Sequence, residues 1–273
     1  MNDLLEFGKF IEALRPWHDR IVVVGGWAHR LYRLHPDANS PQYVPVTTRD
    51  ADIAFSLEKS LDGDIGTSLS QNGFDMEFMG DRTPPVTYYR LGNEDTGFYG
   101  EFLVPLIGGT VNRAGKPVPL TVKTAGITAQ KLRHLEVLLI EPWPVTLDSI
   151  SGFGLTSTAQ ILVPNPVSFL AQKLLIKDKR DSNKQAQDAL YIHDTLDLFA
   201  PKLDLLRELW LESVRPGLPN RTSVRIEQES QEQFDLVTDV HRNAARIAQD
   251  RTIEPLNLQR ACNYGLGEIF SPY

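Results

Sequence analysis

Apolar and polar positions follow two different periods along the chain, and the change between them divides it. Up to residue 163, short apolar or alternating runs predict strands at 21–24, 46–55, 74–79, 86–91, 98–104, 145–147 and 159–163. Apolar stripes at helical spacing predict helices over 3–15 and 128–140 in the same part. From Pro166 onward helical spacing dominates, and helices are expected at 166–180, 184–199, 201–213, 224–248 and 256–263.

These patterns predict an α+β fold, with a mixed sheet flanked by helices and then an all-helical C-terminal region. A length of 273 residues suits one large domain or two modest ones. We place the boundary at the change of pattern, which gives domains 1–163 and 164–273.

Composition excludes several classes of protein. Cys262 is the one cysteine in the sequence, so a disulfide framework and a cysteine-rich zinc site are excluded. The sequence contains no apolar stretch long enough to span a membrane and has no basic leader, which predicts a cytoplasmic protein. The net charge of −7 argues against binding nucleic acid through bulk electrostatics.

The segment VTTRDADIAF, residues 46–55, carries the first candidate chemistry. On a strand, Thr48, Asp50 and Asp52 project from the same face, with the two carboxylates roughly 7 Å apart. Mg²⁺ is commonly held by one or two carboxylates together with substrate phosphates. A polar solvent-facing edge strand is the alternative explanation for the pair.

Two further features in the first part could join this pair. Gly25-Gly26, between an apolar strand and a helix, would let phosphates approach the backbone closely, or could simply form a tight turn. Glu101, in FYGEFLVPL, could supply a third carboxylate on a neighbouring strand, or could be an ordinary edge-strand charge. Three such carboxylates could bind two Mg²⁺ ions for in-line displacement, with Glu101 also accepting a proton.

Basic residues gather in the second part, where the local charge is opposite to that of the whole chain. Lys173, Lys177, Arg180, Lys184 and Asp188 would share one face of a continuous helix. A cap at Ser182-Asn183 would instead divide them between two helices. Such a stripe could neutralise a triphosphate, or could be a solvated helix face.

The order of these features resembles the nucleotidyltransferase fold of the polymerase-beta-like superfamily, over roughly residues 20–199. The segment ILVPNPVSFLAQKLLIKDKRDSNKQAQDAL resembles a bacterial nucleotidyltransferase-fold family and, more distantly, the AbiEii and MenT toxins. The resemblance implies a catalytic domain over 1–163 and a phosphate-binding glycine loop at Gly25 and Gly26. It also implies metal-binding acids at Asp50, Asp52 and Glu101.

The same resemblance assigns nucleotide contacts to a set of residues in both halves of the chain. They are Thr48, Lys173, Arg180, Lys184 and Asp188, and Lys173 is expected to take part in catalysis. The implied reaction is Mg²⁺-dependent transfer of a nucleoside monophosphate from an NTP to a hydroxyl of an RNA 3′ end, a protein or a small molecule, with release of pyrophosphate.

The sequence also departs from the family pattern. Trp27 follows the glycines where many members have a hydroxyl residue, and Val46 replaces the arginine that often precedes the Thr-x-Asp motif. In place of the Arg-Asp of the toxins stands Lys184-Gln185. These departures motivate an alternative, a catalytically impaired nucleotide-binding module of a toxin–antitoxin or regulatory system with a cognate partner protein.

Overall fold

The computed structural model describes residues 3–58, 61–79, 85–93, 97–111, 115–148, 151–248 and 250–271. The chain divides into two compact units. The sheet unit consists of Met1–Leu34 and Thr47–Val163, and the helical unit consists of His35–Val46 and Pro164–Tyr273. The α+β fold expected from the sequence is confirmed, with strands in the first unit and helices dominating the second.

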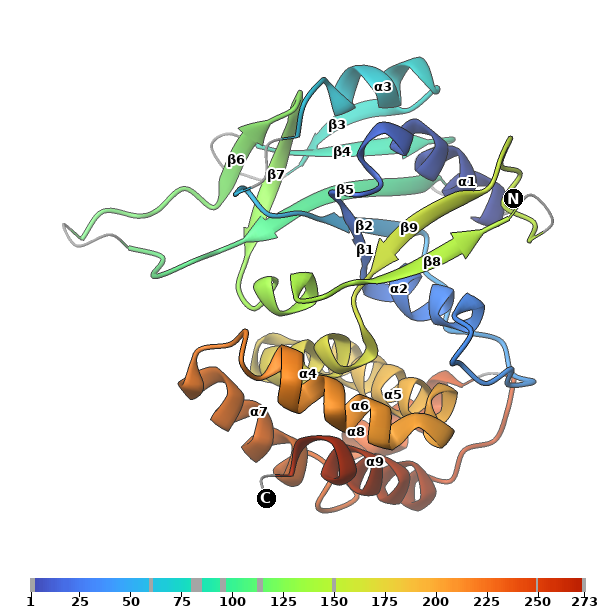
Figure 1. Cartoon of the computed structure of the whole chain (residues 1–273), viewed down its shortest axis with the longest axis vertical. Coiled ribbons are helices and arrows are strands. Elements are labelled where there is room, and N and C mark those ends of the chain that lie inside the picture. The colour runs from blue at the N-terminus through green and yellow to red at the C-terminus, as the bar shows by residue number, and fades with distance from the viewer. Residues whose placement is uncertain are drawn as a thin grey trace. The chain divides into compact units, whose positions relative to one another are not determined.

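Nine strands among the described residues of the sheet unit form one mixed sheet (Figure 1). Its main path runs β3-β4-β5-β2-β1-β9-β8, and β7 pairs with both β5 and β6. Neighbours are parallel in the pairs β2–β5, β1–β9 and β5–β7 and antiparallel elsewhere. The strands are β1 (Val22–Val24), β2 (Asp50–Ala54), β3 (Asp75–Met79), β4 (Val86–Leu91), β5 (Phe98–Pro105), β6 (Thr121–Thr124), β7 (Ile127–Leu132), β8 (Trp143–Leu147) and β9 (Ala159–Val163).

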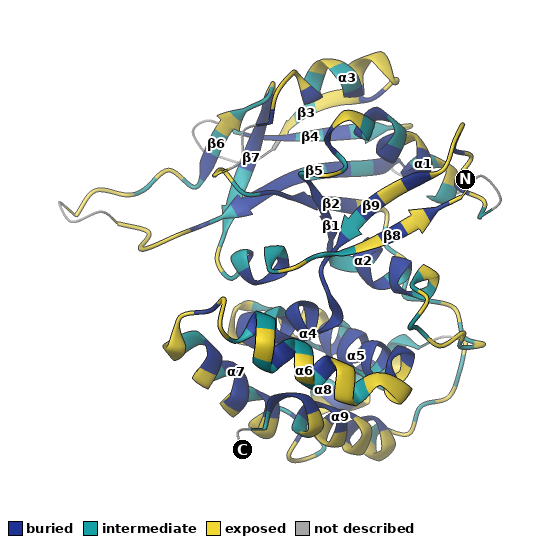
Figure 2. Cartoon of the chain, viewed as in Figure 1, coloured by how far each residue is buried: buried dark blue, intermediate teal, exposed yellow. Residues whose placement is uncertain are grey.

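An aromatic core joins one face of this sheet to helix α1 (Asp3–Ala13). Phe10 packs against Phe98 of β5 and sits so close to Gly100 that an added Cβ there would lie 2.3 Å from its ring. Phe7 stacks on Trp27 of helix α2 (Gly25–Leu31), with ring centroids 3.9 Å apart. Because all these rings are buried, they fix α1 and α2 against the sheet. Figure 2 shows β5 largely in the colour of buried residues. Helix α3 (Ile65–Gln71) contacts α1.

The opposite face carries a smaller apolar cluster, which we call the lower cluster. It consists of Val22, Val24, Ala54 and Leu103 from three strands, covered by Leu135 and Leu138. Leu138 belongs to the short 3₁₀ helix η3 (Glu136–Leu139), and Leu135 immediately precedes it. Leu135 and Leu138 therefore cover the sheet face at the end of β2 and leave the same face uncovered at the start of β2.

The helical unit contains α4 (Pro166–Ile176), α5 (Ser182–Leu198), α6 (Leu203–Leu209), α7 (Asn220–Glu232), α8 (Asp239–Ile247) and α9 (Pro255–Phe270). Side-chain caps define two of the starts, because Asn165 accepts the Ser168 N–H at 2.8 Å and Asp181 accepts the Lys184 N–H at 2.9 Å. No described helix is long and apolar enough to cross a membrane.

Residues His35–Val46 pack with these helices although they lie between two strands of the sheet unit in sequence. The Tyr43 hydroxyl donates to the Asp197 carboxylate at 2.9 Å, and the Asn39 N–H donates to the Leu198 carbonyl at 2.7 Å. Both acceptors belong to α5 or its last turn. The segment is therefore part of the helical unit through hydrogen bonds as well as position.

Several sequence-based expectations about elements were wrong, among them the short helix expected over 256–263, which runs from Pro255 to Phe270. Residues 128–140 do not form a helix, because their first part is strand β7, which pairs with β5. The leucines at helical spacing come partly from β7 and partly from η3. The expected single helix over 224–248 is two helices, α7 and α8. The strand expected from residue 46 begins only at Asp50.

Candidate functional site

Asp50 and Asp52 begin β2 and project from the face that the lower cluster covers farther along the strand. Asp52 pairs with Val24 of β1 on one side and with Glu101 of β5 on the other. Because directly paired residues of neighbouring strands project from the same face, Asp52 and Glu101 lie side by side. Asp50 is exposed, while Asp52 and Glu101 are half-buried. The three carboxylates thus share one face at a solvent-accessible end of β2.

Gly25 closes this group on the β1 side. Its backbone has φ +67°, and a Cβ added there would lie 2.4 Å from Oδ2 of Asp52. A side chain at position 25 would therefore strain the backbone and displace the Asp52 carboxylate. Gly26 continues α2, and the residue before the helix supplies no side-chain cap to its first turn. The sequence-predicted glycine turn and the Asp-x-Asp strand are thus in direct contact.

Thr48 takes a different position from the one that an extended strand predicts. It precedes β2, and its Oγ1 accepts the backbone N–H of Asp50 at 3.3 Å. The side chain therefore stabilises the turn into β2 instead of extending the row of carboxylates along the strand. Its contribution to the site is to fix the start of the strand that carries the acids.

Polar side chains on β4 and β5 extend this face beyond Glu101, a feature that the sequence analysis missed. Tyr99 pairs with Asp50 on one side and with Arg90 of β4 on the other, while Tyr88 of β4 pairs with Glu101. The Arg90 guanidinium is bound by Glu77 of β3. The alternation in VTYYRL is the signal that could have placed Tyr88 and Arg90 on one face.

The described residues contain no group of three or more His, Cys, Asp or Glu side chains arranged closely enough to hold a metal ion. Asp50, Asp52 and Glu101 are therefore neighbours on one face without converging on a common point. Mg²⁺ is commonly bound through one or two carboxylates, with substrate phosphates and water completing its shell, so such convergence is not required of the protein alone.

In the helical unit the structure brings Lys173, Asp188 and Arg180 together. The Lys173 ammonium of α4 donates to Oδ1 of Asp188 of α5 at 2.6 Å, and Arg180 Nε lies 3.3 Å from Oδ2 of the same carboxylate. Lys173 is only 5% exposed, and its Nζ lies 5.2 Å and 5.1 Å from the ring centroids of Phe169 and Tyr191. The charge of Lys173 is therefore neutralised and largely shielded from solvent.

The other basic residues of this stretch are not part of the buried pair. The segment Lys177–Lys179 is a 3₁₀ turn between α4 and α5, so the two-helix alternative for the basic stretch is the one observed. Lys184 lies exposed in the first turn of α5, and Arg180 precedes that helix with its side chain 36% exposed. Lys177 lies 3.4 Å from Glu229 of α7. Arg180 and Lys184 are thus the more accessible of the predicted nucleotide contacts.

Comparison with protein families identifies one match that covers most of the chain. A family model described as nucleotidyltransferase matches residues 3–215, which include the glycine turn, the three carboxylates and the Lys173–Asp188 pair. No curated protein matches the sequence.

Proposed function

The chain belongs to the nucleotidyltransferase family, a class of enzymes that transfer a nucleotidyl group from an NTP to an acceptor, and from this premise we propose a Mg²⁺-dependent reaction centred on β2. The reaction joins a nucleoside monophosphate to a hydroxyl and releases pyrophosphate. Asp50, Asp52 and Glu101 are the residues that we propose for metal binding.

The donor set fits a hard divalent cation. Carboxylate oxygens are the ligands that Mg²⁺ prefers, and the three acids occupy one half-open face where a nucleotide phosphate could complete the coordination. Cross-strand carboxylates repel one another, which a bound cation would relieve. The absence of a closed three-acid group among the described residues suits a metal that arrives with its nucleotide.

The observation that carries this proposal is the register of β2 against its two neighbours. It sets Asp52 beside Glu101 on β5, while the β1–α2 turn holds Gly25 against Asp52. Three motifs far apart in the sequence thus meet at one place. An ordinary edge-strand charge would not account for this, since β2 is an interior strand of the sheet.

Each residue has a definite task in the proposed reaction. Asp50 and Asp52 bind the cation, which would withdraw electron density from the phosphates and lower the pKa of the attacking hydroxyl. The missing side chain of Gly25 leaves room for the Asp52 carboxylate, and the backbone of Gly25 and Gly26 would approach phosphate oxygens closely. Glu101, on the β5 side of Asp52, accepts the proton of the attacking hydroxyl. Thr48 supports these steps by fixing the start of β2.

The basic residues of the helical unit form the second part of the proposal. Arg180 and Lys184 bind triphosphate oxygens and neutralise charge on the leaving pyrophosphate. Lys173 contributes to catalysis and nucleotide binding only if its ammonium separates from the Asp188 carboxylate, because the 2.6 Å ion pair between them otherwise neutralises its charge. This part is tested separately, by NTP affinity in Arg180→Gln and Lys184→Gln proteins.

The impaired-module alternative is favoured by one specific observation. Trp27, which stands where many family members carry a hydroxyl, is fully buried against Phe7 and presents no hydroxyl to a phosphate. A module of this kind, working with a cognate partner protein, would bind NTP without releasing pyrophosphate.

The primary experiment compares the wild type with the double variant Asp50→Asn/Asp52→Asn. Pyrophosphate release from each NTP is measured with Mg²⁺ present, using cellular RNA, protein and small-molecule fractions as acceptors. We expect the double variant to lose activity by about 10²-fold or more, because the removed charges act on the transferring phosphate. The control, Asp204→Asn/Asp235→Asn, changes two exposed aspartates of the helical unit in the same way.

Undiminished transfer by Asp50→Asn/Asp52→Asn would refute the assignment. NTP binding by the wild type in calorimetry, with no pyrophosphate released for any acceptor fraction, would instead favour the impaired module. With labelled NTP, the fraction that becomes labelled identifies the acceptor as an RNA end, a protein or a small molecule.

A further inference from the structure

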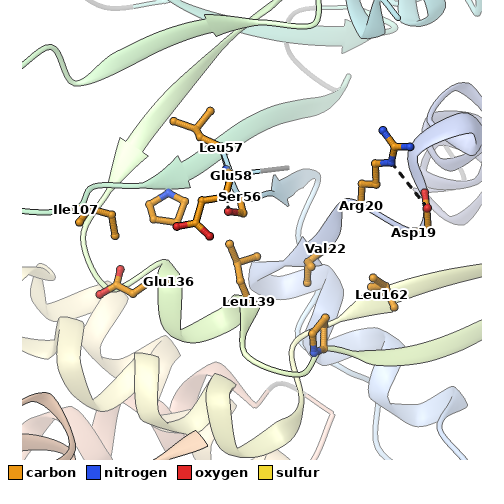
Figure 3. A pocket seen from close by; sticks show the side chains of 12 residues that line it. Asp19, Arg20, Val22, Ser56, Leu57, Glu58, Ile107, Glu136, Leu139 and Leu162 are labelled. Atoms are coloured by element: carbon orange, nitrogen blue, oxygen red, sulfur yellow. Dashed lines mark hydrogen bonds and ion pairs between the residues drawn. The ribbon is translucent and has the colours of Figure 1, made fainter. Parts of the chain in front are cut away.

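The sheet unit contains a cavity that the proposed reaction does not use. Its volume is about 410 Å³, within the range typical of small-molecule pockets. It is lined by the start of β1, by the residues that follow β2 and β5, and by η3 (Figure 3). These elements all belong to the sheet unit, so the cavity is defined within that unit alone.

The cavity lies at the opposite end of β2 from the carboxylate site. Its lining begins at Ser56, four residues beyond Asp52, which corresponds to roughly 13 Å along an extended chain. Ala54 of the lower cluster lies between Asp52 and Ser56 along the chain, while Val22 of the same cluster lines the cavity. A small molecule in the cavity would therefore not meet the atoms that react at Asp50, Asp52 and Glu101.

The wall of the cavity is apolar over much of its surface. Val22, Leu139 and Leu162 come from or pack against the lower cluster, and they form a fixed apolar surface. Leu57 and Ile107 also line the cavity while remaining 47% and 74% exposed. Large apolar side chains exposed at the edge of a cavity are typical of binding sites.

Charge in the lining is unevenly compensated. Arg20 is held by Asp62 at 3.0 Å and lies 3.9 Å from Asp19, so its charge is already balanced by carboxylates. Glu58 and Glu136 also line the cavity, and Figure 3 shows their carboxylates on the same side, with the Arg20–Asp19 pair across from them. The lining therefore has an excess of negative charge on one side.

Glu136 gives this excess a specific point of contact. Its Oε2 is enclosed and makes no hydrogen bond to any described residue, while Oε1 lies 4.0 Å from Nδ1 of His134. Backbone N–H groups of Glu136 and His134 and the charge of Arg133 also act on the carboxylate, whose side chain is 36% exposed. Burial raises the pKa of the Glu136 carboxyl. A cation in the cavity would therefore meet the Glu136 carboxylate at Oε1 and not at the enclosed Oε2.

We propose that this cavity binds a small organic cation with an apolar body. An ammonium or guanidinium group would donate to Glu136 and face Glu58, while the apolar body would lie on Val22, Leu139 and Leu162. Arg20 would not attract an anion, because its two carboxylate neighbours already bind or balance it. The site goes beyond the nucleotidyl transfer proposed above and stands independently of it.

The test uses three probes that share one phenylbutyl body and differ in charge: 4-phenylbutylammonium, 4-phenylbutan-1-ol and 5-phenylpentanoate. Binding to the full chain is followed by methyl NMR, with the signals of Val22, Leu139 and Ile107 as reporters. We expect the ammonium probe to shift these signals saturably and to bind about tenfold more tightly than the alcohol, the difference that a charged hydrogen bond makes. The carboxylate probe should bind more weakly still.

Matched variants separate the charge from the shape of the cavity. Glu136→Gln and Glu58→Gln should each weaken the ammonium probe several-fold and leave the alcohol unchanged. Glu212→Gln, the same change at an exposed position of the helical unit, should alter neither. Equal affinity for ammonium and alcohol, tighter binding of the carboxylate, or no shift of the three reporters at saturating probe would each overturn the proposal. Glu58 is exposed, so Glu58→Gln stays informative if Glu136→Gln fails to fold.

Discussion

Replacing Gly25 with alanine tests whether the glycine turn positions the Asp52 carboxylate. The new Cβ would lie 2.4 Å from Oδ2 of Asp52, and the backbone would keep φ +67°. We expect about 1–2 kcal/mol from the left-handed backbone and about 0.5–1.5 kcal/mol more from turning Asp52 away from its present rotamer. Gly25→Ala should therefore be destabilised by about 1.5–3.5 kcal/mol and lose nucleotidyl transfer.

Gly73→Ala is the matched control, because Gly73 also has a left-handed backbone, φ +84°, but has nothing within 4 Å of an added Cβ. It should show the backbone part alone, about 1–2 kcal/mol, with activity retained. Free energies of unfolding are measured by urea titration followed by circular dichroism, and activity by pyrophosphate release.

A double-mutant cycle isolates the contact itself. In an Asp52→Ala background the second part of the cost should vanish, so Gly25→Ala should then match Gly73→Ala in its effect on the free energy of unfolding. A coupling energy between positions 25 and 52 below about 0.5 kcal/mol would contradict the close contact, since independent sites add within that margin. Full activity of Gly25→Ala would contradict its proposed place in the site.

Two further predictions concern stability. Lys173→Met should lower the free energy of unfolding by about 3–5 kcal/mol, because Arg180 is then the one basic partner left to the buried Asp188 carboxylate. The double variant Lys173→Met/Asp188→Leu should recover most of this loss. A cost of Lys173→Met below about 1 kcal/mol would refute the interpretation of Lys173 and Asp188 as a shielded ion pair. Burial lowers the pKa of His241 in the folded protein. The unfolded chain therefore binds a proton at His241 near pH 6.5, whereas the folded chain does so only at lower pH. The free energy of unfolding should consequently fall as the pH drops through that value. The variant His241→Gln keeps an acceptor for the Thr238 N–H. Its free energy of unfolding, measured between pH 7.5 and 5.5, should vary less with pH than that of the wild type. An unchanged pH dependence would exclude His241 as its source.

The sequence was sufficient to predict the strand that carries the acids but not its neighbours. Alternation along 50–54 is local, so Asp50 and Asp52 could be placed on one face from their spacing alone. The pairing of Asp52 with Glu101 depends on contacts between residues far apart in the chain. Periodicity carries no information on such contacts, so the strand character of 98–104 and the family resemblance gave only the expectation that Glu101 belongs with the pair.

The misassigned helix over 128–140 has the same origin. The helical spacing of Leu132, Leu135 and Leu138 has another cause, since all three leucines belong to or pack against the lower cluster. Leu132 lies at the end of β7, Leu135 in the turn that follows and Leu138 in η3. Pairing with β5 overrides the local preference. Similarly, the charge pattern around Lys173 predicted an accessible cation, and only the packing of α4 against α5 shows Asp188 neutralising it.

The path of the chain through His35–Val46 determines how this protein can be dissected. The polypeptide leaves the sheet unit after Leu34, returns at Thr47 and leaves again after Val163, so neither unit is a continuous stretch of sequence. A fragment covering only 164–273 would lack Tyr43 and Asn39, the hydrogen-bond partners of Asp197 and Leu198. Only three residues separate Val46 from Asp50, so a loop exchange at 35–46 would also alter the entry to the acidic strand. Cutting or recombining the chain at residue 163 therefore does not separate two complete units, because residues 35–46 would stay with the sheet unit.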